Sequence, residues 1–462
     1  MDTFYLSFSQ IRYFFVAVIP GFVFCLSLVP ARVSADEQKF LNSEFATYEI
    51  DLQVRGQVKF AAQPDLHSAS LEINEQPVHA TSSLVYHQHL MDEKSAQREV
   101  VSRRYQRAFA KTGIGSSSVN TKLPEDACDV RVCPNGKSLD FWVPQGFLTQ
   151  PETDLLTVAF DPLYFDALIP PDDSLAGDQW KVSQAAVANL LCIDTIYAGV
   201  LEATVKQCTA EGTRVNIHGT IEGAINGAST SIAVEGDYDW IPSSNSDGEL
   251  SALRVVIQES RTVSYVAPGI DVTAIVKVSC RSGKQRQPKV ITTGIGSMGP
   301  IHGRPRRGPG KPGFQWICDP HRRYDIIYDK SWKIVEQGSE CLTMRLVDEG
   351  ALVSQVTVTP LPPRAEAQTL SDFEEDIEKT LGQQFGHLVS ASLSSRDDGT
   401  TLMRVASVGE AEGLAFHWIH YLLRSPEGQR MSLSFVVEST HFARFSDADR
   451  QYIDGVDLTF KE

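Results

Sequence analysis

The sequence predicts an α+β protein in two parts. The first is a curved, mainly antiparallel β-sheet with two helical segments, arranged like a half-barrel, and the second is a C-terminal α/β sandwich. Many short segments alternate apolar and polar residues, as half-buried strands do. Two stretches of the first half are rich in alanine and leucine, which favour helix. A basic segment rich in glycine and proline separates the halves.

The chain begins with the pattern of an export signal. Residues 13–30 are almost wholly apolar, and the small-residue triplet Val33, Ser34, Ala35 precedes acidic residues. We therefore expect residues 1–35 to be a signal peptide cleaved after Ala35, and the protein to be exported to the periplasm or cell envelope. An uncleaved signal that anchors the protein in the membrane is the alternative, because the apolar core is almost long enough to span a bilayer.

The first predicted strand shows the alternation most clearly. Tyr48, Ile50, Leu52 and Val54 alternate with charged or polar residues, which places the apolar side chains on one face. Further strands are predicted over residues 69–73, 82–90, 99–109, 199–206, 213–221, 230–238, 253–264 and 271–279. This gives about nine strands in one antiparallel sheet.

Two helical segments interrupt these strands. One follows Pro151 and includes Leu155 and Phe160; the other covers residues 183–191 and has Ser183 as its N-cap. A curved sheet that wraps two helices resembles, in layout alone, the half-barrel carriers of lipids and lipoproteins of the cell envelope. No residue motif supports that resemblance.

A basic linker is predicted at residues 281–315. It holds eight cations, no acid and eight glycines, too little apolar content for a core. A flexible tether is the simple interpretation, and a patch that contacts an anionic envelope polymer or lipid is the alternative. Gly294, Gly296 and Gly299 match the dinucleotide-binding pattern, but Pro300 follows where that motif needs a helix. The linker therefore separates two predicted domains, residues 36–280 and residues 316–462.

Charge and cysteine content limit the class of protein. The net charge of −16 argues against nucleic-acid binding, which needs a basic surface. In an exported protein, cysteines favour disulfides over metal sites. The candidate pairs are Cys128–Cys133, Cys192–Cys208 and Cys318–Cys341. An odd count of seven after signal removal leaves at least one thiol unpaired.

The second half predicts a regular order of strands and helices. Strands are expected over residues 324–328, 330–335, 341–346, 352–359, 400–408 and 456–460, with a hairpin of 414–423 and 431–438. Ser371 and Glu374 predict a capping box at the start of a helix. In that helix Leu370, Phe373, Ile377 and Leu381 lie on one face. Ser446 is expected to cap a short helix.

These residues resemble the PsbP-like family, which includes the extrinsic photosystem II proteins and many secreted bacterial relatives. The matching pieces are residues 328–332 (YDKSW), the helix at Ser371, residues 418–421 (WIHY), the turn 425–428 (SPEG), and Ser434 with Phe435. They cover roughly the last 140 residues. The resemblance implies an α/β sandwich that binds or scaffolds, without catalysis. The whole two-part chain also resembles an exported bacterial architecture of no assigned activity.

No catalytic motif or cofactor-binding motif is recognised in the sequence. His87 and His89 lie on one face of a strand, but two histidines are too few for a metal site. His417 and His420 point to opposite faces of their strand, so they cannot act together. The acidic residues 372–378 could supply paired carboxylates for glycoside chemistry, but they fit a solvated helix face. Gly219, Gly223 and Gly227 indicate tight turns or a bulge.

The sequence therefore predicts an exported, non-enzymatic binding or scaffolding protein of the cell envelope. Its partner is unknown; an apolar small molecule or an envelope protein fits the layout. An envelope hydrolase with a dispersed site in the N-terminal cavity is the alternative. Apolar side chains around that cavity would favour a carrier, whereas converging His, Asp and Glu with shifted pKa values would favour an enzyme.

Overall fold

The computed structural model describes residues 45–61, 73–91, 100–136, 138–243, 246–264, 266–283, 309–364 and 368–458. Of these residues, 62% are in strands and 15% are helical. The predicted α+β class is therefore wrong, because the protein is mostly β. Helical patterns are present where the sequence predicts them, but most of these helices end after seven or eight residues, while strands of 14 to 18 residues dominate the N-terminal part.

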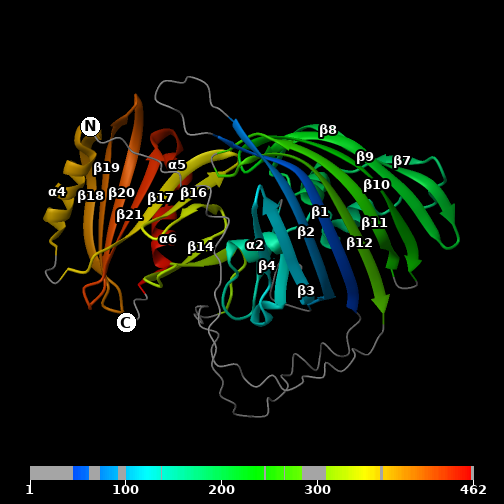
Figure 1. Cartoon of the computed structure of the whole chain (residues 1–462), viewed down its shortest axis with the longest axis horizontal. Helices are drawn as coiled ribbons and strands as arrows, with labels where there is room; N and C mark the ends of the chain where they lie inside the picture. The colour runs from blue at the N-terminus through cyan, green and yellow to red at the C-terminus, as the bar shows by residue number, and fades with distance from the viewer. Residues whose placement is uncertain are drawn as a thin grey trace, which may run out of the picture.

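A 12-stranded antiparallel sheet forms the N-terminal part (Figure 1). Its strand order is β6-β5-β3-β2-β1-β12-β11-β10-β9-β8-β7, with β4 paired to β3. The strands are β1 (Phe45–Ala61), β2 (Ile73–Leu90), β3 (Val101–Ile114), β4 (Ser117–Lys122), β5 (Asp129–Asn135), β6 (Ser138–Trp142), β7 (Gln179–Lys181), β8 (Thr195–Thr209), β9 (Gly212–Ile225), β10 (Ala228–Ser243), β11 (Ser246–Arg261) and β12 (Gly269–Gly283).

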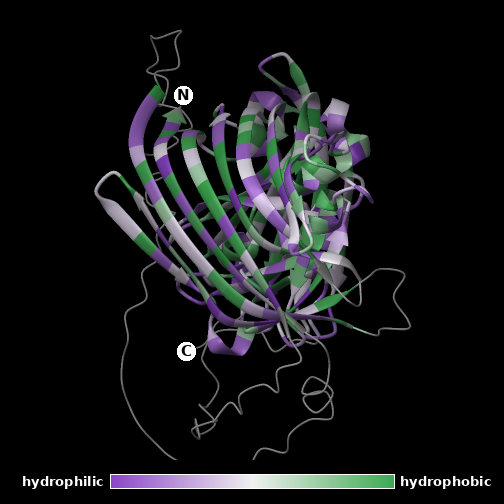
Figure 2. Ribbon diagram, turned by 90° about the vertical axis from the view of Figure 1, so that its right-hand side faces the viewer, coloured by the Kyte–Doolittle hydropathy of each residue, from purple (hydrophilic) through white to green (hydrophobic). Residues whose placement is uncertain are grey.

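The alternation of side chains gives this curved sheet a buried face and a solvent-facing face. Figure 2 shows hydrophilic and hydrophobic residues alternating along long strands that bend around one side. Ile50 on β1 and Leu84 on β2 are cross-strand neighbours, and both are buried in the core. The sequence prediction missed β4 to β7, because three to seven residues are too few to show an alternation.

Helical segments pack inside the curve of the sheet (Figure 1). They are α2 (Gln150–Leu156), the 3-10 helix η3 (Pro162–Leu168) and α3 (Gln184–Leu191). Thr149 caps α2 through a capping box with Glu152. Ser183 caps α3 by accepting from the Ala186 amide, which confirms the prediction for that residue. A further 3-10 turn, η2 (Glu125–Ala127), connects β4 and β5.

The C-terminal part contains two more sheets. The three-stranded sheet has the order β13-β14-β22, and the seven-stranded sheet has the order β15-β16-β17-β21-β20-β19-β18. The strands are β13 (Phe314–Cys318), β14 (Tyr324–Asp329), β15 (Trp332–Gln337), β16 (Leu342–Asp348), β17 (Ala351–Leu361), β18 (Phe385–Ser395), β19 (Thr401–Ala411), β20 (Leu414–Arg424), β21 (Arg430–Glu438) and β22 (Val456–Leu458). The predicted hairpin is confirmed as β20 and β21.

The helices of this part are α4 (Leu370–Leu381), α5 (Phe442–Phe445) and α6 (Ala448–Asp454), with 3-10 turns η4 (Gly382–Gln384) and η5 (Ser439–His441). Phe373 and Ile377 of α4 pack on β19 and β20, as the helical periodicity predicts. The predicted cap is wrong by two residues: Thr369 caps α4 through a capping box with Asp372. Ser446 does not cap α6 either, since its backbone has a φ of 47° and the N-cap is Asp447.

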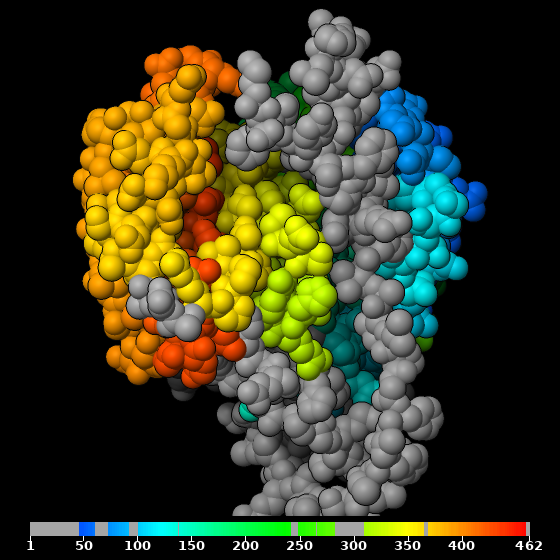
Figure 3. Space-filling view, turned by 60° about the vertical axis from the view of Figure 1, so that its left-hand side comes forward, coloured from blue at the N-terminus to red at the C-terminus, as the bar shows by residue number. Residues whose placement is uncertain are grey.

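The two parts are in direct contact, and Figure 3 shows the yellow-to-red C-terminal residues beside the rest of the chain. Lys330 lies 2.5 Å from the buried Asp140 carboxylate and donates to Ser138 at 2.8 Å. The Trp316 amide donates to the Leu148 carbonyl at 2.9 Å. The contact therefore combines a charged pair with backbone hydrogen bonds.

The β9–β10 turn also meets the β16–β17 turn. At the close approach a Cβ on Gly227 would lie 2.7 Å from the Gly350 carbonyl oxygen, and Gly227 has a φ of 75°. Glycine is therefore required there, as the sequence predicts for a tight turn. Gly219 and Gly223 lie within β9, where a Cβ would clash with the backbone of β8.

Several predictions concern residues outside the described ranges. These are the signal peptide and its cleavage after Ala35, most of the 281–315 linker, and the glycine pattern at Gly294, Gly296 and Gly299. Within the described ranges, no helix has both the length and the apolar character needed to cross a bilayer.

Candidate functional site

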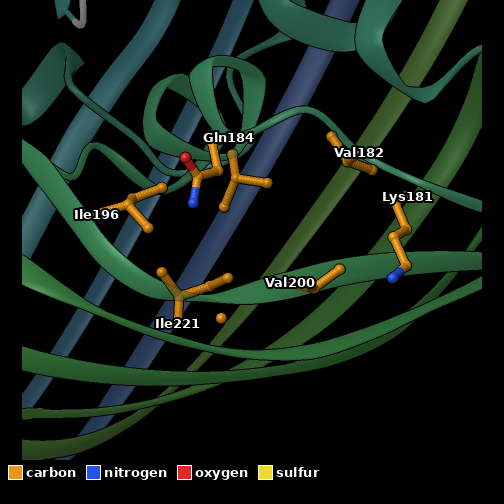
Figure 4. Close-up of a pocket in the computed structure, with 8 residues that line it drawn as sticks. Lys181, Val182, Gln184, Ile196, Val200 and Ile221 are labelled. Atoms are coloured by element: carbon orange, nitrogen blue, oxygen red, sulfur yellow. The ribbon is translucent and has the colours of Figure 1, made fainter.

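A small cavity lies between α3 and the concave surface formed by β8 and β9. Its volume is about 220 Å³. Figure 4 shows Val182 and Gln184 on one side of the space, with Val200 and Ile221 on the other. The complete lining is Lys181, Val182, Gln184, Val187, Ile196, Gly199, Val200 and Ile221. Five of these eight residues are valine or isoleucine, so the cavity is suited to an apolar group.

Strand β8 is irregular beside the cavity. Ile221 lies opposite Gly199 in the β8–β9 ladder, and a register shift occurs between Ile196 and Ala198. Gly199 has a φ of 105°, and a Cβ there would lie 2.1 Å from the Thr220 carbonyl oxygen of β9, so glycine is required at this position. The bulge bends β8 beside the cavity. Val200 is 40% exposed, so the space is open to solvent along this strand.

Charged residues lie only at the rim. Lys181 is an exposed lining residue, and its Nζ is 3.8 Å from the Glu202 carboxylate. The other carboxylate oxygen of Glu202 is 3.8 Å from Nε2 of His218. Such exposed pairs are weak and exchange readily with solvent. Lys181 is thus the charged group best placed to meet a polar end of a bound molecule.

Polar contacts hold η3 and α3 in place. The Tyr238 hydroxyl donates to the Leu168 carbonyl at 2.6 Å. Cys192 ends α3 in a left-handed conformation, with a φ of 54°, and its thiol donates to the Val158 carbonyl. Burial raises the pKa of this thiol to about 12, so it stays protonated and unreactive at neutral pH.

A buried ion pair lies under the same segments. Nη1 of Arg103, on β3, donates to Asp161 at 2.7 Å, and Nε donates to Gln88 at 2.8 Å. Asp161 also accepts from the Leu163 amide and so caps η3. The guanidinium lies over the Tyr86 ring, 4.7 Å from its centroid, and burial raises the pKa of Tyr105 to about 12. These contacts fix the helical segments to the sheet.

Sequence reasoning missed this pair. Asp161 followed by Pro162 is a typical start of a short helix and could have been recognised. Its partner could not, because nothing local connects residue 103 with residue 161.

The histidine pairs do not form sites. Nδ1 of His87 lies 2.9 Å from Thr47 Oγ1, and its Nε2 lies 2.7 Å from Gln106. Burial and then Arg104 lower the pKa of His87, and burial and then Arg131 lower the pKa of His89. The arginines at this surface oppose a bound cation. Among the described residues, no three His, Cys, Asp or Glu side chains come together as metal ligands would.

His417 and His420 are separated, as predicted. His417 stacks on Phe442 with centroids 3.8 Å apart. His420 is held by Ser434 at 2.9 Å, and burial lowers its pKa to about 4. The acidic residues of α4 lie mainly on its exposed face, where Lys379 pairs with Glu375 at 2.8 Å. Neither these histidines nor the acidic residues of α4 line the cavity.

The predicted disulfides are not formed. No disulfide joins the seven cysteines that the structure describes. Cys192 is bonded to the Val158 carbonyl, whereas Cys208 is exposed and accepts from Thr213. The thiol of Cys128 donates to the Pro124 carbonyl, and that of Cys318 donates to the Asp319 carbonyl. The local folds therefore direct these thiols to backbone carbonyls, and Cys133 and Cys341 are not at bonding distance from their expected partners.

One carboxyl at the contact between the parts has a raised pKa. Asp154 of α2 keeps solvent contact, but the surrounding protein raises its pKa to about 6. The charge of Lys333 on β15 opposes this rise, and burial lowers the pKa of the Lys333 amine. Gln150 beside it accepts from the Ile334 amide at 3.2 Å. This group belongs to the interface and lies outside the cavity lining.

No family model and no curated protein matches the chain. Among solved structures, the solution structure of cyanobacterial PsbP (CyanoP) from Synechocystis sp. PCC 6803 is similar at 13% identity and a TM-score of 0.27, over 32% of this chain and 92% of that one. OccK1 (OpdK) of Pseudomonas aeruginosa is similar at 10% identity and a TM-score of 0.13, over 85% of this chain and 97% of that one. The PsbP-like resemblance is thus matched by a weak structural likeness over about a third of the chain.

Proposed function

We propose that this protein is an exported, non-enzymatic binding protein of the cell envelope, and that the cavity under α3 holds an apolar part of its ligand. The observation that carries the proposal is the lining of aliphatic side chains from α3, β8 and β9, with its charges confined to the rim. The apolar stretch and the small-residue triplet in residues 1–35 support the export part of this proposal.

The size of the cavity limits what it accepts. Its 220 Å³ is below the roughly 300–1,000 Å³ of sites that enclose a drug-sized ligand. One end of an acyl or isoprenoid chain would fit, with the remainder outside. Lys181 at the rim would then lie near the polar end of such a ligand.

A fluorescent apolar probe tests this function. N-phenyl-1-naphthylamine should bind the purified full chain and brighten, and Val200→Trp should weaken its binding at least about tenfold by filling the cavity. Tyr197→Trp is the matched control, since Tyr197 lies on the same strand, is 66% exposed and does not line the cavity. Equal binding by both variants would show that the probe binds elsewhere.

Native mass spectrometry of protein purified from its own envelope gives an independent readout. A retained apolar molecule should appear on the parent and be depleted on Val200→Trp. If the parent carries no ligand and binds no probe, the binding proposal fails.

A further inference from the structure

Strand β18 is an edge strand of the seven-stranded sheet. It pairs with β19 alone among the described strands, at the end of the seven-stranded sheet. Nine of its eleven residues are exposed. Backbone N–H and C=O groups along such an edge are ready to pair with another strand.

This edge lacks the charged residues and the proline that often prevent pairing. Residues 385–395 read FGHLVSASLSS, with no Asp, Glu, Lys, Arg or Pro. Charged side chains, proline and short length are the common protections of an edge strand. The opposite edge, β15, carries Lys333 and Glu336, and the edge strand β7 of the large sheet has only three residues.

Apolar side chains are concentrated on the same strand. Leu388, Val389 and Leu393 are 38%, 55% and 58% exposed. They are three of the eleven large apolar side chains found exposed in the described part of the chain. Such a grouping marks an interaction surface more often than isolated exposed residues do.

The regular part of the strand limits where pairing occurs. Register shifts lie between Phe385 and His387 and between Leu388 and Ser390. From Ser390 to Ser395 the pairing with β19 is unbroken. Bulges bend an edge away from a partner, so the six regular residues are the segment that can add a strand.

We propose that β18 is a dimerisation edge, and that its occupant is β18 of a second copy of this chain. The two copies run antiparallel about a two-fold axis near Ser392, and the two seven-stranded sheets become continuous. Close to a two-fold axis a side chain lies near its own copy on the other strand, so a charge at that point would repel itself. A neutral strand meets this condition on a chain whose net charge is −16.

The side chains fit such a pair. Serine at 390, 392, 394 and 395 is small and allows hydrogen bonds between opposing hydroxyls. With Ser392 at the axis, Leu393 of one copy packs beside Ala391 of the other. Both lie on the sheet face that carries α4, because their partners on β19 are Met403 and Val405 of the α4 core.

Sedimentation velocity of the purified full chain tests the proposal. The dimer fraction should rise with concentration, and Leu393→Lys should raise the dissociation constant at least about tenfold. Leu175→Lys is the matched control, because Leu175 is 69% exposed and lies between η3 and β7. If Leu393→Lys fails to fold by circular dichroism, Ser394→Lys replaces it at an exposed position.

Hydrogen–deuterium exchange locates the interface. Raising the protein concentration should slow exchange in peptides that cover residues 385–395. A chain that stays monomeric at all concentrations overturns the proposal. A dimer that Leu393→Lys leaves intact, or protection that maps to another strand, overturns it as well.

Discussion

The guanidinium of Arg103 and the carboxylate of Asp161 form a doubly bonded ion pair at the centre of the N-terminal core. The distances are 2.7 Å from Nη1 to Oδ2 and 2.5 Å from Nη2 to Oδ1. The side chains are 1% and 2% exposed. The pair joins β3 to the N-cap of η3, and η3 contacts α3, which lines the cavity.

Asp161→Asn should lower the free energy of unfolding by about 3–5 kcal/mol, because it leaves the buried Arg103 charge without a counter-ion. Urea denaturation of the full chain measures this. Glu49→Gln is the control: it removes the exposed carboxylate that pairs with Arg107 at 2.9 Å and should cost less than about 1 kcal/mol. Similar small losses in both variants would contradict the structural role of the buried pair.

The N-terminal sheet was predictable, but its central pair was not. Alternation at Tyr48, Ile50 and Leu52 depends on neighbouring residues, so the sequence shows it directly. The Arg103–Asp161 pair depends on a contact across 58 residues, which no local pattern encodes. The cavity lies beside a bulge in β8 between Ile196 and Ala198, and a bulge produces no periodic signal.

Asp154→Asn should remove a pH-dependent part of the stability. Desolvation by the surrounding protein raises the pKa of Asp154 from 3.8 to about 6, although the side chain keeps solvent contact. A raised folded-state pKa gives stability that is complete below about pH 4 and is lost as pH rises through about 6. The melting temperature of the variant, relative to the parent, should therefore be higher at pH 7.5 than at pH 4.5.

Thermal unfolding followed at several pH values checks this expectation. Asp126→Asn, at an exposed position in η2, controls for the loss of one carboxylate. Parallel pH profiles for the parent and Asp154→Asn would mean that Asp154 titrates with the same pKa in the folded and unfolded states.

Trp332→Ala should destabilise the protein by about 3–5 kcal/mol, the usual cost of removing a large buried ring. Trp332 is 3% exposed and contacts Phe435 and Tyr452 edge-on, with centroids 5.9 and 5.2 Å apart. Chemical denaturation followed by circular dichroism measures the loss. Phe442→Ala, which removes a ring that is 38% exposed, should cost much less.

The start of α4 shows how a helix can be predicted while its cap is misplaced. Leu370, Phe373 and Ile377 have helical spacing, and this predicted the buried face. The sequence contains two overlapping capping-box patterns: Asp372 follows Thr369 by three residues, and Glu374 follows Ser371 by three residues. Local patterns alone do not choose between them.

Thr369→Ala should therefore lower the stability by about 1 kcal/mol, whereas Ser371→Ala should have little effect. Thr369 Oγ1 accepts from the Asp372 amide at 3.1 Å, and Asp372 accepts from the Thr369 amide at 3.0 Å. Hydrogen bonding to Thr369 lowers the pKa of Asp372, so the box is strongest where that carboxyl is ionised. Hydrogen exchange of the α4 amides in both variants measures the effect at the helix itself. Faster exchange in Ser371→Ala than in Thr369→Ala would place the cap at Ser371.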